Sequence, residues 1–98
     1  MEILIQAIRF EPTEQLQDFV HKKVGKLEKF SDEIRKVEVS LKVVKPETAL
    51  NKEASIRVVG KNDLFAEKVC DTFEEAIDNC MEALLKQVQK NKEKHAGR

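Results

Sequence analysis

The segment from Lys36 to Val44 alternates between polar and apolar side chains as far as Val43, and this pattern most restricts how the chain can fold. Val37, Val39 and Leu41 point one way, and charged or hydroxyl side chains stand between them. A period of two residues is typical of a β-strand with one dry face and one wet face. The pattern therefore predicts a sheet that buries only one face, and the rest of the chain must cover that face.

Three other segments have the composition and period of strands. Glu2 to Ile8 and Ala54 to Val59 each alternate, with small or branched apolar residues on one side. Leu64 to Val69 is expected to be a returning strand, because Gly60–Asp63 before it has the composition of a hairpin turn. The pattern of this last strand leaves open which way it faces. Lys45 to Asn51, which contains a proline, is expected to be a loop.

The remaining chain has helical periodicity in two places. Between Glu14 and Phe30, apolar residues recur at intervals of three and four, with Thr13 as the expected N-cap and Ser31–Asp32 as the end. A second helix is expected to start near Asp71 or Thr72. Its broad apolar stripe consists of Phe73, Ala76, Ile77, Cys80, Met81, Leu84, Leu85 and Val88. Apolar residues run out near Lys90, so the chain from about residue 91 is expected to be a flexible tail.

The order of elements is therefore β-α-β-β-β-α, which predicts an α+β fold in two layers. A right-handed first crossover puts its helix on one face of the sheet, and the final helix must cover apolar surface beside it. The expected architecture is a four-stranded mixed sheet with two helices packed on one face. The 98 residues suit a single domain spanning residues 1–98.

Charge is balanced in total but separated along the sequence. There are 18 basic and 18 acidic residues. From Asp71 to Glu82 the charged residues are all acidic, whereas from Ala83 to Arg98 all but Glu93 are basic. Lys86, Lys90 and Lys94 follow one another at intervals of four.

The first predicted helix carries a similar basic flank, formed by Lys22, Lys26 and Lys29, with Lys23 nearer the core edge. Two interpretations remain open. Basic residues near a helix C-terminus complement its dipole and solvate it. Lysines four residues apart also repel each other, which favours an external anionic partner.

Other features limit what such a partner could be. The chain has no Trp or Tyr, and its five Phe are expected to be mostly buried, so no stacking platform for single-stranded bases is expected. Contacts to nucleic acid would go to phosphates and follow its shape.

Catalytic and metal-binding patterns are not found in the sequence. It has no Gly-rich phosphate loop, nucleophile elbow or triad signature, which argues against an enzyme. Cys70 and Cys80 are expected to be free buried thiols, and neither a metal nor a cofactor is expected. No apolar run is long enough to span a membrane and no signal peptide is evident, so a cytoplasmic location is expected without membrane or small-molecule partners.

Three stretches carry a resemblance to a known family. They are PTEQLQDFVHKKVGKLEKF (12–30), IRKVEVSLKVVK (34–45) and DTFEEAIDNCMEALLKQVQKNKEK (71–94). Together they resemble the ribosome hibernation promoting factors, also called ribosome-associated inhibitors or sigma-54 modulation proteins, in their short form. The resemblance covers nearly the whole chain. The chain departs from the family pattern at Ala83, where a basic residue is common, and at Thr72–Glu74, where the aromatic residue is displaced.

The resemblance implies a fold related in shape to double-stranded RNA-binding domains. It implies binding to the small (30S) ribosomal subunit through 16S rRNA, between head and body, with the mRNA channel and the A and P tRNA sites blocked in stationary phase or stress. A second small factor for ribosome dimerisation is a further implied partner. By position, the implied RNA-binding residues are Lys22, Lys23, Lys26, Lys29, Lys86, Lys90 and Lys94. The alternative hypothesis is a protein-interaction module that modulates a transcription (sigma) factor.

Overall fold

Strands and helices follow one another in the predicted order. The computed structural model describes residues 1–29, 34–44, 50–61 and 63–96, with side chains up to residue 89. The elements are β1 (Glu2–Ile8), α1 (Glu14–Val24), a short 3-10 helix η1 (Gly25–Lys29), β2 (Ile34–Val43), β3 (Lys52–Gly60), β4 (Leu64–Cys70) and α2 (Phe73–Ala96).

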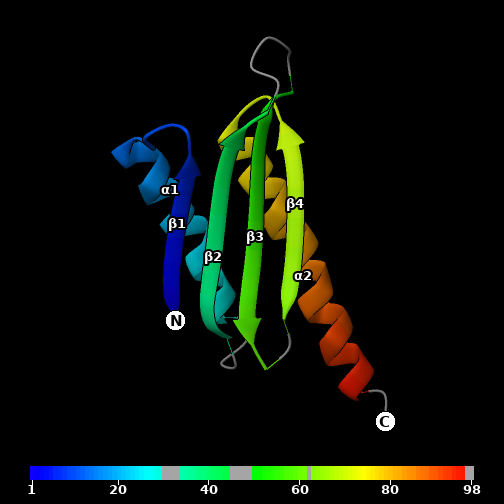
Figure 1. Ribbon diagram of the computed structural model, residues 1–98. Helices are drawn as coiled ribbons and strands as arrows, with labels where there is room; N and C mark the ends of the chain where they lie inside the picture. Colours follow the sequence, from blue (N-terminus) through cyan, green and yellow to red (C-terminus); the bar gives the residue numbers. More distant parts are fainter. Residues whose placement is uncertain (30–33, 45–49, 62, 97–98) are drawn as a thin grey trace.

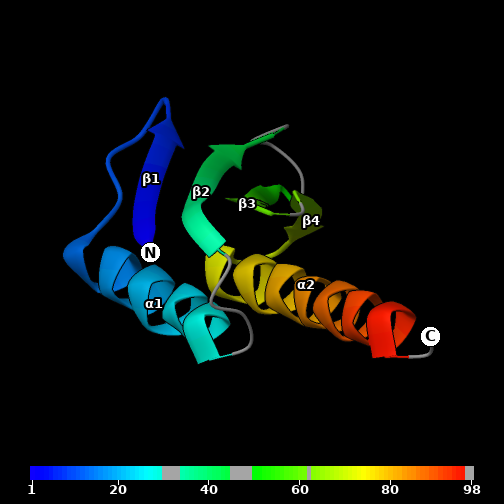
Figure 2. The ribbon, with the colours of Figure 1, turned by 90° about the horizontal axis from the view of Figure 1, so that it is seen from below.

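The four strands form one mixed sheet in the order β1-β2-β3-β4. β1 and β2 are parallel, and the other two pairs are antiparallel. Both helices lie on the same face of this sheet, with α1 under β1 and α2 under β3 and β4 (Figures 1 and 2). The predicted two-layer α+β architecture is thus confirmed, and the described residues leave one face of the sheet uncovered.

The core lies between the sheet and the helices. The alternating residues of β2 and β3 point into it, and Leu27, Ile77 and Leu84 close it from the helix side with no exposed surface. Ala66 and Cys70 are buried, which settles the facing of β4. Phe65 and Val69 therefore point away from the helices.

The sequence predicts one continuous helix from Glu14 to Phe30, but the structure has two helical segments there. The α-helix ends at Val24, and Gly25–Lys29 continues as the tighter 3-10 helix. Gly25 has a φ of −57° and a ψ of −23°, which are typical of a 3-10 helix. Glycine is also unfavourable in the interior of an α-helix, which is consistent with the change at this residue. The i+3 spacing from Val24 to Leu27 still brings Leu27 into the core. Phe30 and Ser31–Asp32 lie outside the described residues.

Both helices begin at a threonine N-cap, which the sequence predicts for Thr13. The Thr13 hydroxyl accepts a hydrogen bond from the Leu16 N–H at 3.0 Å. The Thr72 hydroxyl accepts one from the Glu75 N–H at 3.1 Å and begins α2. α2 extends to Ala96, farther than its apolar pattern, because its last turns contain good helix formers.

One phenylalanine is more exposed than expected. Phe73 is buried and stacks on half-buried Phe10, with ring centroids 5.0 Å apart. Phe19 is also half-buried, and Phe65 is 53% exposed because its strand position faces away from the helices. The prediction of mostly buried rings therefore holds for Phe10, Phe19 and Phe73 and fails for Phe65, and Phe30 lies outside the described residues.

Candidate nucleic-acid interface

Three predicted lysines of the first helical segment project into solvent. Lys22 is on α1, and Lys26 and Lys29 are on η1; all three are exposed. This orientation follows from the opposite side of the segment, where Val20, Val24 and Leu27 are fully buried against the sheet. The three ammonium groups are therefore available to an anionic partner.

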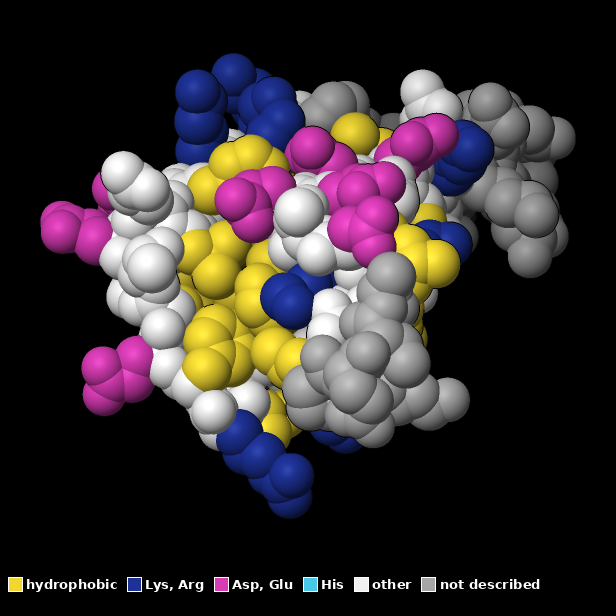
Figure 3. All heavy atoms as spheres, turned by 90° about the horizontal axis from the view of Figure 1, so that it is seen from above, with side chains coloured by type: hydrophobic (Ala, Val, Ile, Leu, Met, Phe, Trp, Pro, Cys, Tyr) yellow, Lys and Arg dark blue, Asp and Glu magenta, His cyan; other side chains and the backbone are white. Residues whose placement is uncertain are grey.

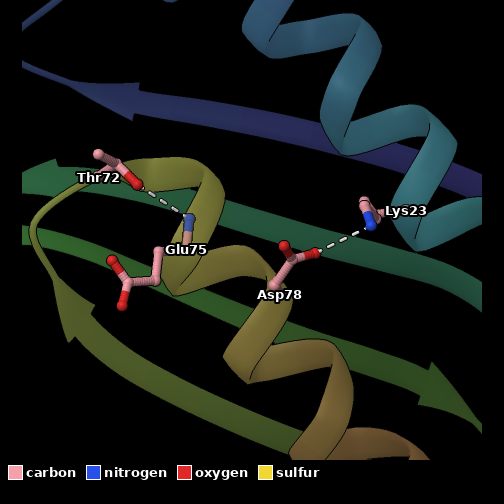
Figure 4. Close-up of polar contacts among 4 residues, drawn as sticks. All are labelled: Lys23, Thr72, Glu75 and Asp78. Atoms are coloured by element: carbon pink, nitrogen blue, oxygen red, sulfur yellow. Dashed lines mark hydrogen bonds and ion pairs between the residues drawn. The ribbon is translucent and has the colours of Figure 1, made fainter.

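Lys23 has a different environment. Its side chain is only 30% exposed, and its Nζ lies 3.2 Å from the Oδ1 of Asp78 on α2. The same Nζ lies 5.5 Å from the centroid of the Phe19 ring, within the range of a cation–π interaction. Figure 4 shows the ion pair bridging the two helices. Lys23 thus links α1 to α2 at the position where the sequence predicts a phosphate contact.

The basic row of α2 is described only at its start. Lys86 is 75% exposed, and its Nζ lies 3.6 Å from the Oε1 of Glu82, which is one turn earlier and 67% exposed. Pairs of this exposed i,i+4 kind contribute only about 0.3–0.5 kcal/mol, so this pair leaves Lys86 available. Lys90 and Lys94 occupy helical backbone of α2, and their side chains lie outside the described residues.

The acidic start of α2 lies at a different end of the molecule from η1 and the end of α2. Asp71, Glu74 and Glu75 are exposed where α2 begins, and acidic side chains gather at that end of the molecule in Figure 3. Both helices run away from this end, and the last part of α2 leads past the edge strand β4 and away from η1 (Figures 1 and 2). The acids at the start of α2 thus lie apart from η1 and from the end of α2.

The cysteines have the properties of core residues. Cys70 and Cys80 are free and buried, as predicted. The Cys80 Sγ lies 3.3 Å from the carbonyl oxygen of Ala54 and 3.7 Å from that of Ala66, so the two oxygens share its one S–H donor. Burial raises the pKa of this thiol to about 11. A reactive cysteine needs a lowered pKa, so this thiol is unsuited to nucleophilic chemistry.

Two further findings concern only the part of the chain that the structure describes. There, His, Cys, Asp and Glu form no group of three or more that could hold a metal ion. In the same residues, no helix has both the length and the apolar character that a membrane crossing requires.

Comparison with known proteins gives the family. Residues 3–96 match the model of the family described as Sigma 54 modulation protein / S30EA ribosomal protein. The chain belongs to this family. The resemblance inferred from the three sequence stretches is thereby confirmed.

Two curated relatives are consistent with this family membership. The chain is 34% identical over 94 residues to the ribosome hibernation promoting factor of Escherichia coli (strain K12), covering 96% of each chain. It is 31% identical to that of Pseudomonas putida (strain KT2440), covering 96% of this chain and 89% of the relative. These names describe a ribosome factor and not an enzyme.

Solved structures share the fold. A ribosomal subunit interface protein from Coxiella burnetii superposes with a TM-score of 0.79 at 22% identity, covering 94% of this chain and 98% of that one. The N-terminal domain of Thermus thermophilus Protein Y gives 0.76 at 25% identity, covering 92% and 98%.

Asp78 is the residue that sequence reasoning missed. In the sequence it is one of the acids between Asp71 and Glu82, and nothing in its local pattern points to Lys23. Only the packing of α1 beside α2 brings the two together.

Proposed function

We propose that the protein is a ribosome hibernation factor that binds the small (30S) subunit through 16S rRNA and stops translation. The observation that carries this proposal is the family relationship along residues 3–96, with relatives named ribosome hibernation promoting factor. The exposed lysines of α1, η1 and α2 supply the chemistry that such a partner requires, because rRNA presents phosphates on its surface.

The mechanism we propose is steric. Lysine ammonium groups hold phosphates, and the folded body occupies the mRNA channel and the A and P tRNA sites. The Cα positions extend over 50 × 23 × 16 Å, so a bound molecule is a large obstacle to an mRNA strand. No chemical step is required, which agrees with the unreactive thiol. The proposal includes action in the cytoplasm during stationary phase or stress. It includes a second small factor for ribosome dimerisation only on the strength of the resemblance.

Reversal of charge on the α2 row tests the proposal. Each phosphate contact releases counterions, so log K falls with log salt concentration by about 0.7 to 0.9 per contact. K86E/K90E should weaken binding to small subunits at least tenfold. The dependence of log K on log salt should become shallower by the amount that corresponds to about two phosphate contacts. Co-sedimentation across a salt series measures both quantities, and circular dichroism checks the fold.

K42E/R57E is the matched control, since it makes the same change in net charge on the uncovered face of the sheet. It should bind more tightly than K86E/K90E. Equal loss in both variants would mean that total charge, and not the α2 row, determines binding, and undiminished binding of K86E/K90E would remove the row from the interface.

The alternative of a sigma-factor module receives less support. A protein-docking surface usually contains a continuous apolar patch. Among the described residues, the large exposed apolar side chains of the sheet are Leu4 on β1 and Phe65 and Val69 on β4, at opposite edges of the sheet. A pull-down from stationary-phase lysate distinguishes the two functions, because the proposal requires rRNA in the captured material and the alternative requires a sigma factor without it.

A further inference from the structure

Asp78 and Lys23 form the ion pair that joins the two helices. Asp78 is 50% exposed and Lys23 30% exposed, so the pair lies at the seam between α1 and α2 and is partly open to solvent. The Phe19 ring covers another side of the ammonium group. Lys23 is thus held by a carboxylate on one helix and by an aromatic face on its own helix.

We propose that Asp78 is a positioning residue that withholds Lys23 from the RNA-binding surface and so limits the affinity of the protein for RNA phosphates. This inference rests on the proposed function. Lys22, Lys26 and Lys29 then carry the phosphate contacts of the first helical segment, whereas Lys23 fixes the angle between the helices.

The physical reason is competition between two anions for one ammonium group. A phosphate can reach Lys23 only by displacing a carboxylate 3.2 Å away, or by approaching a carboxylate that repels it. At about 0.15 M salt that repulsion extends over about 8 Å, which includes a directly bound phosphate. Asp78 therefore reduces phosphate binding both by occupying Lys23 and by its own charge.

The pair of Lys86 with Glu82 makes the difference clear. Both of its side chains are mostly exposed, both belong to one helix, and the distance between the charged atoms is 3.6 Å. Phosphate can replace Glu82 without disturbing a helix contact. The two ion pairs therefore have different consequences, since one leaves its lysine available and the other does not.

Asp78→Asn is the decisive variant, because asparagine keeps the size of the side chain and removes its charge. With Lys23 released, the dependence of log K on log salt should steepen by about one contact, on bare RNA duplex and on small subunits. A slope steeper by 0.9 corresponds to binding up to about eightfold tighter at 0.1 M salt.

Three companion variants isolate the cause. Lys23→Met alone should leave the salt slope unchanged, since Lys23 makes no phosphate contact in the unaltered protein. D78N/K23M should return the slope to that value. Glu75→Gln removes the same charge one turn earlier on α2, where the side chain points away from Lys23 (Figure 4), and should change the slope much less than Asp78→Asn. Thermal unfolding confirms that each variant is folded.

The outcomes separate this inference from the proposed function. A steeper slope of D78N on bare duplex, lost in D78N/K23M, supports the role of Asp78 whether or not the protein binds small subunits. Absence of small-subunit binding by the unaltered protein rejects the proposed function. The inference is overturned if the salt slope of D78N is unchanged or shallower, or if no variant binds RNA. It is also overturned if Lys23→Met alone lowers the slope.

Discussion

The two faces of the sheet differ in what their side chains do. Those on the covered face form the core, and those on the uncovered face contact solvent. On the covered face, Val37, Leu41 and Ile56 have no exposed surface. On the uncovered face, the neighbouring positions carry charged side chains such as Arg57, which is exposed. Strand neighbours thus face different environments although they share the same backbone. The difference teaches that the helices, and not the strands themselves, decide which side chains stabilise the fold.

The largest expected effect comes from adjacent residues of β3 that point to opposite faces. Ile56→Ala should lower the free energy of unfolding by about 2–5 kcal/mol, because it leaves a cavity under the helices. Arg57→Ala should change it by only about 0.5 kcal/mol, since its one described ion pair, to Asp63 at 3.8 Å, is exposed. Urea unfolding measures both. Losses of similar size would mean that the two faces are not energetically distinct.

A smaller effect is expected where the helix that covers this face begins. Thr72→Ala removes the acceptor for the Glu75 N–H and should cost about 1 kcal/mol of unfolding free energy. Thr72→Ser keeps the hydroxyl and should cost clearly less. Thermal unfolding followed by circular dichroism compares the two. If both variants lose the same stability, the methyl group and not the cap is responsible.

The sequence predicts the covered face well because the signal for it is local. Alternation in Lys36–Val44 requires a strand with one dry face, and the helical stripes indicate what covers it. The α-to-3-10 change at Gly25 was missed, because the spacing of three from Val24 to Leu27 fits both kinds of helix. The facing of β4 could not be predicted, since Phe65 and Val69 are as apolar as the inward Ala66.

The candidate interface is less predictable because it depends on contacts between distant segments. The exposed state of Lys22, Lys26 and Lys29 follows from helical periodicity, since the buried stripe fixes the opposite side. The pairing of Lys23 with Asp78 does not, because each residue alone fits an ordinary solvated helix. Assignment of lysines to RNA binding therefore needs the partner of each ammonium group as well as its position along the helix.

The smallest expected effect concerns two carboxylates on the uncovered face. Glu53 on β3 has its pKa raised above the ordinary 4.5 by burial, then by the charge and hydrogen bond of Glu67, while Lys42 opposes the shift. The folded protein therefore binds this proton more firmly than the unfolded chain does. Stability from this group is lost as the pH rises from 4.5 through the raised pKa.

Glu53→Gln should remove this loss and stabilise the fold at neutral pH by about 0.2–1 kcal/mol, the range for cross-strand pairs. The advantage of this variant should disappear when the pH falls below 4.5, because the protonated Glu53 carboxyl is then as neutral as the glutamine side chain. Glu67→Gln should give a smaller gain, because the burial of Glu53 remains. Urea unfolding across this pH range measures the differences. An advantage of Glu53→Gln that does not change with pH would show that side-chain shape, and not charge, lowers the stability at this position. The uncovered face would then depend on packing more than the comparison of the two faces implies.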